Sequence, residues 1–393
     1  MRLVWFTDSN MREWGGDYYP VIDESVHFIP RISERLDSFT MLSRCLIDAQ
    51  PQTGSQPIVF KDNANFVALP FYNNTIDYYK RLPLLLLRTF PIANRYIKNS
   101  DVVVIRHHNC FSWLYYILSK WHGKPVVSKW ASAIDDFVQA NFPSSSLVDR
   151  MANVVAKFEM WYGKKIAHGS SLNLMLDDRT YDKLGRPLHV HKSVISFVSD
   201  VDLTSSLERD RWMLVYAGRL TRSKGVHDLL EVFSTLIPDF PLARLSIAGV
   251  GDYEDKLKEL CREKNMEDRV LFLGRLTRSE LRKLFQTSGV FVSPSYAEGL
   301  PKIMWEAWAS RIAVVMSDVG GVPEYLRDGV NGKLVQPGDH DGLSRAIRDL
   351  LSNPEHLKMI SDEGWMTAKQ HTWEMEIDKM YEAIYESTKG AQS

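Results

Sequence analysis

The stretch SPSYAEGLPKIMWEA, residues 293–307, decides how the second half of this 393-residue chain is interpreted. The apolar run at 290–293 is typical of a buried strand, and Pro301 suits the first position of a helix because its missing N–H would be unpaired there anyway. The pattern therefore predicts a strand, a glycine loop and a helix that begins at about Pro301. Neither Gly299 nor Leu300 carries a side-chain oxygen that caps a helix, so the first-turn N–H groups are predicted to be open to an anion such as phosphate.

Two carboxylates accompany this helix start. Glu298 lies in the loop before the amides, and Glu306 lies about two turns into the helix. Carboxylates accept hydrogen bonds from sugar hydroxyls, while a helix N-terminus attracts phosphate. The combination predicts a nucleotide-sugar site. A carboxylate pair for glycoside hydrolysis is the alternative, but two groups at one helix start are awkwardly placed to flank a sugar ring.

Composition sets wide bounds on the class of protein. Hydrophobic residues make up 45% and charged residues 25%, as in a soluble globular protein, and the length predicts two domains. The net charge of -1 gives no argument for a nucleic-acid partner. Three widely spaced cysteines without a CxxC pair favour a reducing cytoplasm and argue against structural zinc. No Asp, Glu or His cluster has the spacing of metal ligands, so we expect neither a metal nor a cofactor.

The ends of the chain and its apolar runs bear on localisation. Residues 1–8 are interpreted as a first strand because their apolar run is too short for a signal peptide. The longest apolar run, 82–87, is interrupted by Pro83 and cannot span a bilayer. A cytoplasmic protein is expected.

Strands and helices alternate along the whole chain, which predicts α/β domains with parallel sheets. The periodicity breaks between about 184 and 210, so we expect an N-terminal domain over 1–200, a second domain over 201–370 and a final helix over 371–393. In such doubly wound domains, ligands bind at the carboxyl ends of the strands. The strands expected in the second domain are residues 213–217, 244–248, 270–273, 290–293, 313–316 and 333–335.

Two further loops follow strands of the second domain. In GRLTRSKG, residues 218–225, Arg219 and Lys224 are placed to clamp a diphosphate, although a solvated loop is the alternative for such residues. In AGVGD, Gly249 opens a tight turn that resembles the start of a dinucleotide fingerprint. The third glycine is missing, because Glu254 holds its place, so NAD binding is disfavoured.

The first half has a looser pattern. The glycines Gly15 and Gly16 in WGGDY are predicted to form a loop that leads into a helix. His107 follows a strand expected at 101–105, and it either contacts substrate or is an ordinary surface or core histidine. Trp130 follows another expected strand and is either a stacking wall for a sugar or a core aromatic. Asp135 comes a few residues later, and we assign it with His107 and Trp130 to the acceptor side of the site.

Residues 78–98 mix cations with apolar side chains. This composition is typical of a segment lying on an anionic membrane surface near a lipid-linked acceptor. A buried helix with basic edges is the alternative, which we favour slightly.

Taken together, these motifs resemble the retaining nucleotide-sugar glycosyltransferases of family 4, which have the GT-B fold of two Rossmann-like doubly wound domains facing a cleft. The resemblance is strong over 213–386 and weak before that. It rests on Glu298 and Glu306 (E-x7-E) and on the sequence runs GRL and KG at 218–225, GVG at 249–251, VGGVPE at 319–324 and DGVNG at 328–332.

The resemblance implies roles for these residues. Arg219 and Lys224 would hold the donor diphosphate, Glu298 would contact the donor sugar, and Glu306 would accept from the ribose hydroxyls. The remaining donor contacts that it implies are Gly15, Gly16, Gly249, Arg275, Leu276, Gly299, Leu300, Pro301 and Lys302. The final helix would cross back to the N-terminal domain.

One departure concerns the acceptor side. Many members carry a histidine facing the donor sugar in the loop after the strand at 125–128, where this chain has Trp130 or Ala131. The expected function is still metal-independent transfer, with retention, of a sugar from a nucleotide diphosphate sugar to a saccharide hydroxyl. The alternatives are a catalytically silent sugar-nucleotide-binding subunit and a GT-B phosphorylase or hexose-phosphate synthase.

Overall fold

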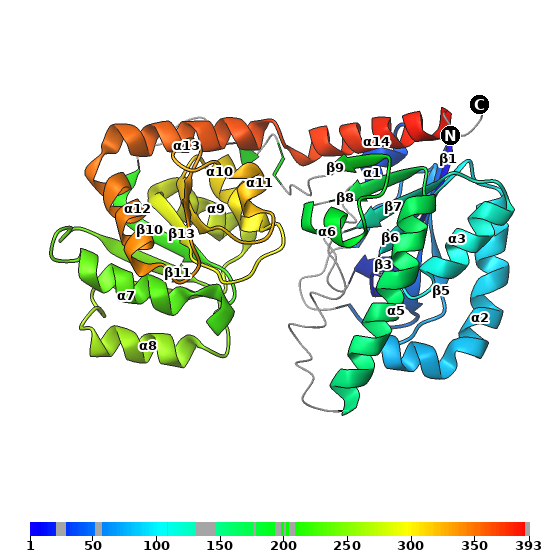
Figure 1. Cartoon of the computed structure of the whole chain (residues 1–393), viewed down its shortest axis with the longest axis horizontal. Helices are drawn as coiled ribbons and strands as arrows, with labels where there is room; N and C mark the ends of the chain where they lie inside the picture. Colours follow the sequence, from blue (N-terminus) through cyan, green and yellow to red (C-terminus); the bar gives the residue numbers. More distant parts are fainter. Residues whose placement is uncertain are drawn as a thin grey trace. The chain divides into compact units, whose positions relative to one another are not determined.

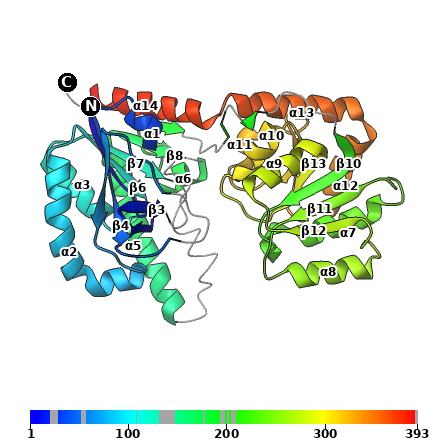
Figure 2. The same cartoon turned by 180° about the vertical axis from the view of Figure 1, so that it is seen from behind.

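The computed structural model describes residues 1–20, 29–51, 57–107, 109–130, 147–175, 178–192, 198–199, 202–203 and 209–389. The chain divides into two compact units (Figures 1 and 2). Unit 1 comprises Met1–Val194 and Glu376–Ser393, and unit 2 comprises Ile195–Met375. The sequence predicts these boundaries at 200/201 and 370/371, a few residues from those of the structure at 194/195 and 375/376.

Unit 1 is built on a mostly parallel sheet. Within the described residues its strand order is β3-β2-β4-β1-β6-β7-β8-β9, with β5 paired to β4. The strands are β1 (Arg2–Phe6), β2 (Met11–Trp14), β3 (Asp17–Pro20), β4 (Ser38–Leu46), β5 (Ala64–Leu69), β6 (Val102–His107), β7 (Val126–Trp130), β8 (Leu172–Met175) and β9 (Val190–Lys192). The helices are α1 (Ile29–Ser33), α2 (Thr75–Lys98), α3 (Ser112–Trp121), α5 (Leu147–Gly169), α6 (Asp178–Lys183) and α14 (Trp373–Lys389).

Helices cover both faces of this sheet because successive strand side chains point to opposite sides. Val4 and Phe6 of β1 pack with α2 and α3 in one core cluster. On the opposite face, Lys129 of β7 reaches Met380 of α14, and α14 is also tied to α1 by an ion pair between Asp378 and Arg31. The last helix therefore completes the unit in which the chain begins.

The segment around Gly15 and Gly16 corrects one prediction. It joins β2 and β3 as an antiparallel hairpin, in which Trp14 pairs with Asp17, and it leads into no helix. The two glycines have φ of 62° and 91°, and consecutive positive φ angles match the twist of a two-residue hairpin turn. The pattern WGGD was therefore a hairpin signal.

Two other predicted loops of unit 1 also belong to strands. His107 is the last residue of β6 and Trp130 is the last residue of β7, where they are register partners. Their rings stack at 3.7 Å between centroids, 2° from parallel, and both side chains are buried. Asp135 lies outside the described residues.

Unit 2 has an all-parallel sheet with strand order β12-β11-β10-β13-β14-β15. The strands are β10 (Asp210–Ala217), β11 (Arg244–Ala248), β12 (Val270–Gly274), β13 (Ser288–Ser293), β14 (Ala313–Ser317) and β15 (Lys333–Val335). The helices are the short η3 (Arg222–Lys224), α7 (Val226–Leu236), α8 (Glu254–Glu263), α9 (Arg278–Thr287), α10 (Lys302–Ala309), α11 (Val322–Tyr325), α12 (His340–Ser352) and α13 (Pro354–Lys369). All six strands were predicted within a few residues.

A continuous apolar core holds unit 2 together. It joins buried side chains of β10, β11 and β13 to the inner sides of α7 and α12. The sheet order places β10 and β13 in the centre, where the two directions of the winding meet. In sheets of this kind the carboxyl ends of the strands at that point are the usual ligand site.

Candidate donor-binding site

A pocket of about 730 Å³ opens at the carboxyl ends of the central strands of unit 2. Ala217 ends β10 and Ala248 ends β11, Gly218 and Gly249 follow them, and Ser293 ends β13. The remaining lining residues are Tyr216, Arg219, Lys224, Val250, Arg275, Leu276, Leu281, Glu298, Pro301, Lys302 and Ile303. Eight residues of the predicted donor set thus line one pocket, namely Arg219, Lys224, Gly249, Arg275, Leu276, Glu298, Pro301 and Lys302.

The charges around the pocket are unequal. Four cations line it, whereas Glu298 is its one carboxylate among the described residues. Lys224 Nζ lies 2.6 Å from Glu298 Oε1, and both side chains are mostly buried, at 16% and 13% exposure. Ser295 Oγ donates to the same carboxylate oxygen at 2.8 Å. The net lining charge is therefore positive, which suits a diphosphate.

The helix start behaves as expected, with a shift of one residue. Pro301 is the N-cap of α10 rather than its first helical residue, and its φ and ψ of -72° and 117° are extended. No side chain caps the helix. The first-turn amides of α10, from Lys302 onward, therefore sit at the pocket with the positive end of the helix dipole.

Close backbone packing explains the glycines at the strand ends. A Cβ on Gly249 would lie 1.8 Å from Gly218 O, and a Cβ on Gly225 would lie 2.0 Å from Pro294 O. Gly225 also has φ of 66°, in the left-handed region. Only glycine permits these approaches without displacing backbone. The turns bring Arg219 and Lys224 to the edge of the pocket.

The motif at 319–324 supports the loop that carries Glu298. Gly321 N donates to Gly299 O at 2.8 Å, and a Cβ on Gly320 would lie 2.1 Å from Glu298 O. In the sequence analysis these residues have no role beyond the family pattern. Their structural role is to pack against the backbone of the loop that carries Glu298.

Tyr216 is another pocket residue that the sequence reasoning missed. Its hydroxyl donates to Arg219 O at 2.9 Å, which fixes the loop that carries this arginine. Burial, and then the charge of Glu298, raise the pKa of Tyr216 above its ordinary value, so the phenol stays protonated. A tyrosine at the end of a buried strand gives no sequence signal that separates it from a core residue.

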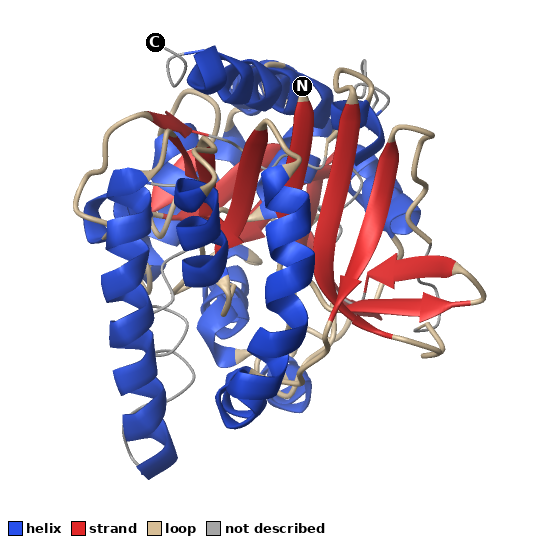
Figure 3. Ribbon diagram, turned by 90° about the vertical axis from the view of Figure 1, so that its right-hand side faces the viewer, coloured by secondary structure: helices blue, strands red, loops and turns tan. Residues whose placement is uncertain are grey.

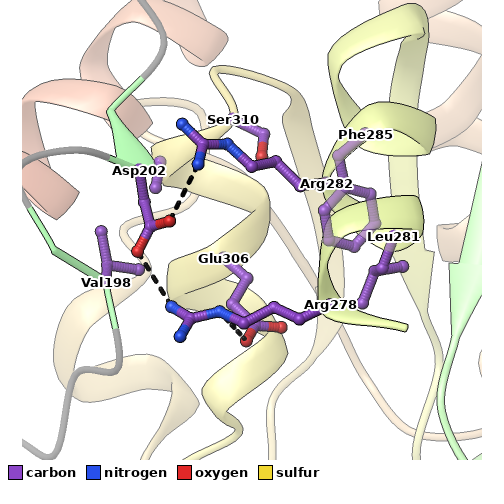
Figure 4. A pocket seen from close by; sticks show the side chains of 9 residues that line it. Val198, Asp202, Arg278, Leu281, Arg282, Phe285, Glu306 and Ser310 are labelled. Atoms are coloured by element: carbon purple, nitrogen blue, oxygen red, sulfur yellow. Dashed lines mark hydrogen bonds and ion pairs between the residues drawn. The ribbon is translucent and has the colours of Figure 1, made fainter. Parts of the chain in front are cut away.

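Glu306 lies in a separate, smaller cavity of about 20 Å³, shown in Figure 4. Its Oε1 lies 4.0 Å from Arg278 Nε, and Arg278 donates to Asp202 Oδ2 at 2.9 Å. Asp202 also accepts from Arg282 at 3.1 Å. Figure 4 shows Arg278 between the two carboxylates. Leu281 lines both cavities, so the two sites are neighbours.

A capping box opens α9. Thr277 accepts from the Glu280 amide, and the Glu280 side chain accepts from the Thr277 amide. This cap fixes Arg278 at the first helical position, directly after Arg275 and Leu276 of the large pocket. Gly299 and Leu300 are not among the lining residues of either cavity, and Gly15 and Gly16 lie in unit 1.

Comparison with known families agrees with this geometry. The model of the family described as glycosyl transferases group 1 matches residues 203–365, which include every residue of the large pocket. Residues 203–365 are therefore similar to a group 1 glycosyl transferase domain. This match covers most of unit 2 and leaves all of unit 1 outside it.

Curated relatives match the same part of the chain. An uncharacterized glycosyltransferase of Methanocaldococcus jannaschii is 34% identical over 147 residues, 37% of each protein. A glycogen synthase of Mycobacterium tuberculosis is 32% identical over 168 residues, 40% of this chain and 41% of the relative. An alpha-maltose-1-phosphate synthase of the same organism is 33% identical over 167 residues, 40% and 43%. The matches therefore span about two fifths of these relatives.

Solved structures extend the likeness of fold to the whole chain. Sucrose-phosphate synthase from Thermosynechococcus elongatus gives a TM-score of 0.69 at 17% identity and covers all of both chains. The lipopolysaccharide outer core galactosyltransferase WaaB gives 0.69 at 16% identity over 98% of this chain and 99% of that one. Anabaena HepE in complex with UDP gives 0.67 at 14% identity over 99% and 100%. The predicted GT-B fold is confirmed.

Proposed function

We propose that this protein transfers a sugar from a nucleotide diphosphate sugar to a hydroxyl acceptor, with retention at the anomeric carbon and without a metal ion. The observation that carries the proposal is the pocket of unit 2, where four cations and the N-terminus of α10 surround a single carboxylate among the described residues. A diphosphate leaving group supplies the negative charge that this lining lacks. The fixed cations take the place of a divalent ion in neutralising that charge.

Each residue has a proposed part in the reaction. Arg219 and Lys224 hold the diphosphate, Glu298 accepts from hydroxyls of the donor sugar, and Glu306 accepts from the ribose. The acceptor hydroxyl attacks the anomeric carbon from the face that the diphosphate leaves. Its proton passes to an oxygen of the departing phosphate, so the products are the glycoside and the nucleoside diphosphate.

The ion pair between Lys224 and Glu298 suits both of these parts. In the structure the carboxylate already has two partners on Oε1, Lys224 and Ser295, and both fix its orientation. When a diphosphate binds, the ammonium group has three donors to share between the phosphate and the carboxylate. Lys224 therefore couples recognition of the phosphate to the position of the group that holds the sugar.

The acceptor is proposed to be a saccharide, carried by a lipid, in glycan or polysaccharide biosynthesis. Residues 78–98 lie within α2, which buries Tyr78, Leu85 and Ile97 in the core but exposes Leu84 and Leu87. The exposed side supports peripheral contact with a membrane, at the inner face for a cytoplasmic protein. None of the helices in the described residues is long and apolar enough to cross a bilayer.

A panel of UDP, GDP, dTDP, ADP and CMP with their sugars tests the donor site by thermal shift. A ligand present at about 100 times its dissociation constant stabilises the folded protein by roughly 2.7 kcal/mol. One nucleotide is expected to stabilise the wild type and to lose this effect in Lys224→Ala. Lys264→Ala is the matched control, because Lys264 is also ion-paired in unit 2, to Glu231, and lies outside the pocket.

Two results would count against the proposal. If no nucleotide stabilises the protein, the donor site is wrong. If a nucleotide sugar binds but is never consumed with any acceptor, the protein is a binding subunit. Turnover of a sugar phosphate with inorganic phosphate instead would favour a phosphorylase or a hexose-phosphate synthase. One of the relatives is named alpha-maltose-1-phosphate synthase.

A further inference from the structure

Three helices of unit 1 form a layer whose outer side has no covering element among the described residues of that unit. Figure 3 shows α5, α3 and α2 side by side in front of the sheet. Their inner sides are buried, as at Leu85 of α2, Tyr115 and Leu118 of α3, and Ile166 of α5. The outer side of this layer is called here the basic helical face.

Large apolar side chains are exposed on this face. Trp121, with 76% of its surface exposed, lies one turn from Ile117 on α3, and Trp161 lies one turn from Phe158 on α5. Spacings of three and four residues place side chains on the same side of a helix. The further members are Tyr79, Leu84, Leu87 and Phe90 of α2 and Val154 of α5. Several large exposed apolar side chains on neighbouring helices are typical of a site of interaction.

The charges on the same face are of one sign. Among the side chains described on the three helices, ten lysines and arginines are exposed, whereas no aspartate or glutamate is. They are Lys80, Arg81, Arg88, Arg95, Lys98, Lys120, Arg150, Lys157, Lys164 and Lys165. Two carboxylates of these helices have described side chains, and both are partly or fully withdrawn: Asp77 is in an ion pair with Arg81, and Glu159 is in the interior. The side chain of Asp149, in α5, lies outside the described ones. The whole chain, by contrast, has a net charge of -1.

Cations and aromatic rings alternate at short range. Lys165 Nζ lies 4.8 Å from the centroid of the Trp161 ring, and Lys120 Nζ lies 5.5 Å from that of Tyr116. Long basic side chains beside tryptophan are the combination found where helices lie at the boundary of lipid and water. The ring enters the headgroup layer, while the ammonium group reaches the lipid phosphates.

We propose that the basic helical face docks on a bilayer of anionic phospholipid, with Trp121 and Trp161 inserted at the headgroup level. The proposal deepens the contact proposed for residues 78–98 by adding α3 and α5 as its anchor. It rests on the proposed function only in that a lipid-carried acceptor would give the protein a reason to bind a membrane. Each lysine or arginine near an anionic surface strengthens partitioning by about fivefold, so ten cations need not all make contact.

A second copy of the chain fits this face poorly. A two-fold dimer would bring the same surface patch of each subunit together. Ten exposed cations would then meet ten others, and like charges brought together in an interface oppose association. An anionic lipid surface satisfies both the charges and the apolar side chains.

Co-sedimentation of the full chain with vesicles tests the proposal without any donor or acceptor. Binding is expected to vesicles of phosphatidylglycerol and phosphatidylcholine, to weaken steeply with added salt, and to be absent with pure phosphatidylcholine. The double variant Trp121→Glu/Trp161→Glu should weaken binding at least tenfold. The double variant Lys164→Gln/Lys165→Gln should weaken it several-fold and reduce its dependence on salt.

Matched controls come from unit 2. Leu242 and Leu271 are exposed to a similar degree, 63% and 59%, so Leu242→Glu/Leu271→Glu adds the same charge outside the face and should leave vesicle binding unchanged. Equal binding to neutral and anionic vesicles, absence of binding to both, or an equal loss in the control would overturn the proposal. So would a dimer in sedimentation velocity that Trp121→Glu dissociates. The nucleotide thermal shift should be the same in all variants, so this test and that of the donor site fail separately.

Discussion

The carboxyl ends of the strands differ in how the two units use their charges. In unit 2 they surround an open pocket with four cations and one carboxylate. In unit 1 the carboxylate that follows β1, Asp8, is mostly buried. It lies 3.0 Å from Arg44 and accepts from the Tyr72 hydroxyl at 2.6 Å. Arg106 nearby donates to the hydroxyls of Thr7 and Ser9. The charged side chains of unit 2 face a pocket that suits a ligand, whereas those of unit 1 contact other residues of the same unit.

This difference predicts where single substitutions act. A change in the pocket of unit 2 should alter chemistry and leave folding largely intact. A change among the buried polar groups of unit 1 should alter stability and its dependence on pH. The four experiments below test this division, beginning with the largest expected effect.

Lys224→Ala should lower kcat/KM for release of nucleoside diphosphate by about 10²–10³-fold, as expected when a charged partner of a developing anion is removed. The same change leaves Glu298 with Ser295 as its described partner, so Lys224→Arg should recover part of the loss. Steady-state kinetics with the donor identified by thermal shift measures both. An effect equal to that of Lys264→Ala would show that the ion pair is only structural.

Gly225→Ala should destabilise unit 2 by about 3 kcal/mol or more, because its Cβ would overlap Pro294 O as well as force an L-residue into the left-handed region. Gly329→Ala separates the two causes. Gly329 has φ of 70° but nothing within 4 Å of an added Cβ, so only the conformational cost of about 1 kcal/mol applies. Urea unfolding compares them, and equal losses would contradict the assigned close approach.

Glu159→Gln should stabilise unit 1 above neutral pH and do little near pH 4. Burial raises the pKa of Glu159 to about 7 and that of Asp8 to about 6, and the charge of Asp8 adds to the effect on Glu159. The native state therefore binds more protons than the unfolded state between about pH 4 and 7, and stability falls as pH rises through that window.

The gain from Glu159→Gln should reach at most about 3 kcal/mol by pH 8, where the wild-type carboxyl must ionise in the interior. Thermal unfolding at pH 5 and pH 8 measures it. Glu231→Gln, at a half-exposed ion pair with Lys264, is the comparison and should show no such rise with pH. A constant difference between wild type and Glu159→Gln at both pH values would contradict the raised pKa.

Arg278→Gln should weaken nucleotide binding several-fold, about 1 kcal/mol, because it removes the cation between Asp202 and Glu306. Arg282→Gln is the matched control, since Arg282 also pairs with Asp202. Calorimetric titration with the nucleotide should show a larger loss for Arg278→Gln and partial recovery in Arg278→Lys. Equal losses would indicate that Asp202 alone matters.

The sequence predicted unit 2 well because local pattern and fold agree there. Short apolar runs became parallel strands, and the chemistry at their ends lay in contiguous motifs such as residues 218–225. The residues that the sequence analysis missed in unit 2 carry no local sequence signal. Tyr216 resembles any core residue in the sequence, and Asp202 lies 76 residues from Arg278.

Unit 1 was less predictable for a physical reason. Gly15 and Gly16 fit either a phosphate loop or a hairpin turn, and only the pairing of β2 with β3 decides between them. His107 and Trp130 extend strands that we ended too early, so their stacking depends on register. The exposed side of α3 and α5 has the same apolar spacing as a core-facing side. Periodicity shows that a helix has an apolar side but not what covers it.

The order of synthesis follows from the divided sequence of unit 1. Residues from Glu376 onward belong to unit 1, and Asp378 of α14 pairs with Arg31 of α1. These residues leave the ribosome only after all of unit 2 has been made. Unit 2 is contiguous and can fold while the chain is still growing, but unit 1, although translated first, must wait for the last helix. Unit 1 therefore stays incomplete for longer during synthesis than unit 2, and a nascent-chain chaperone would have to protect it for longer.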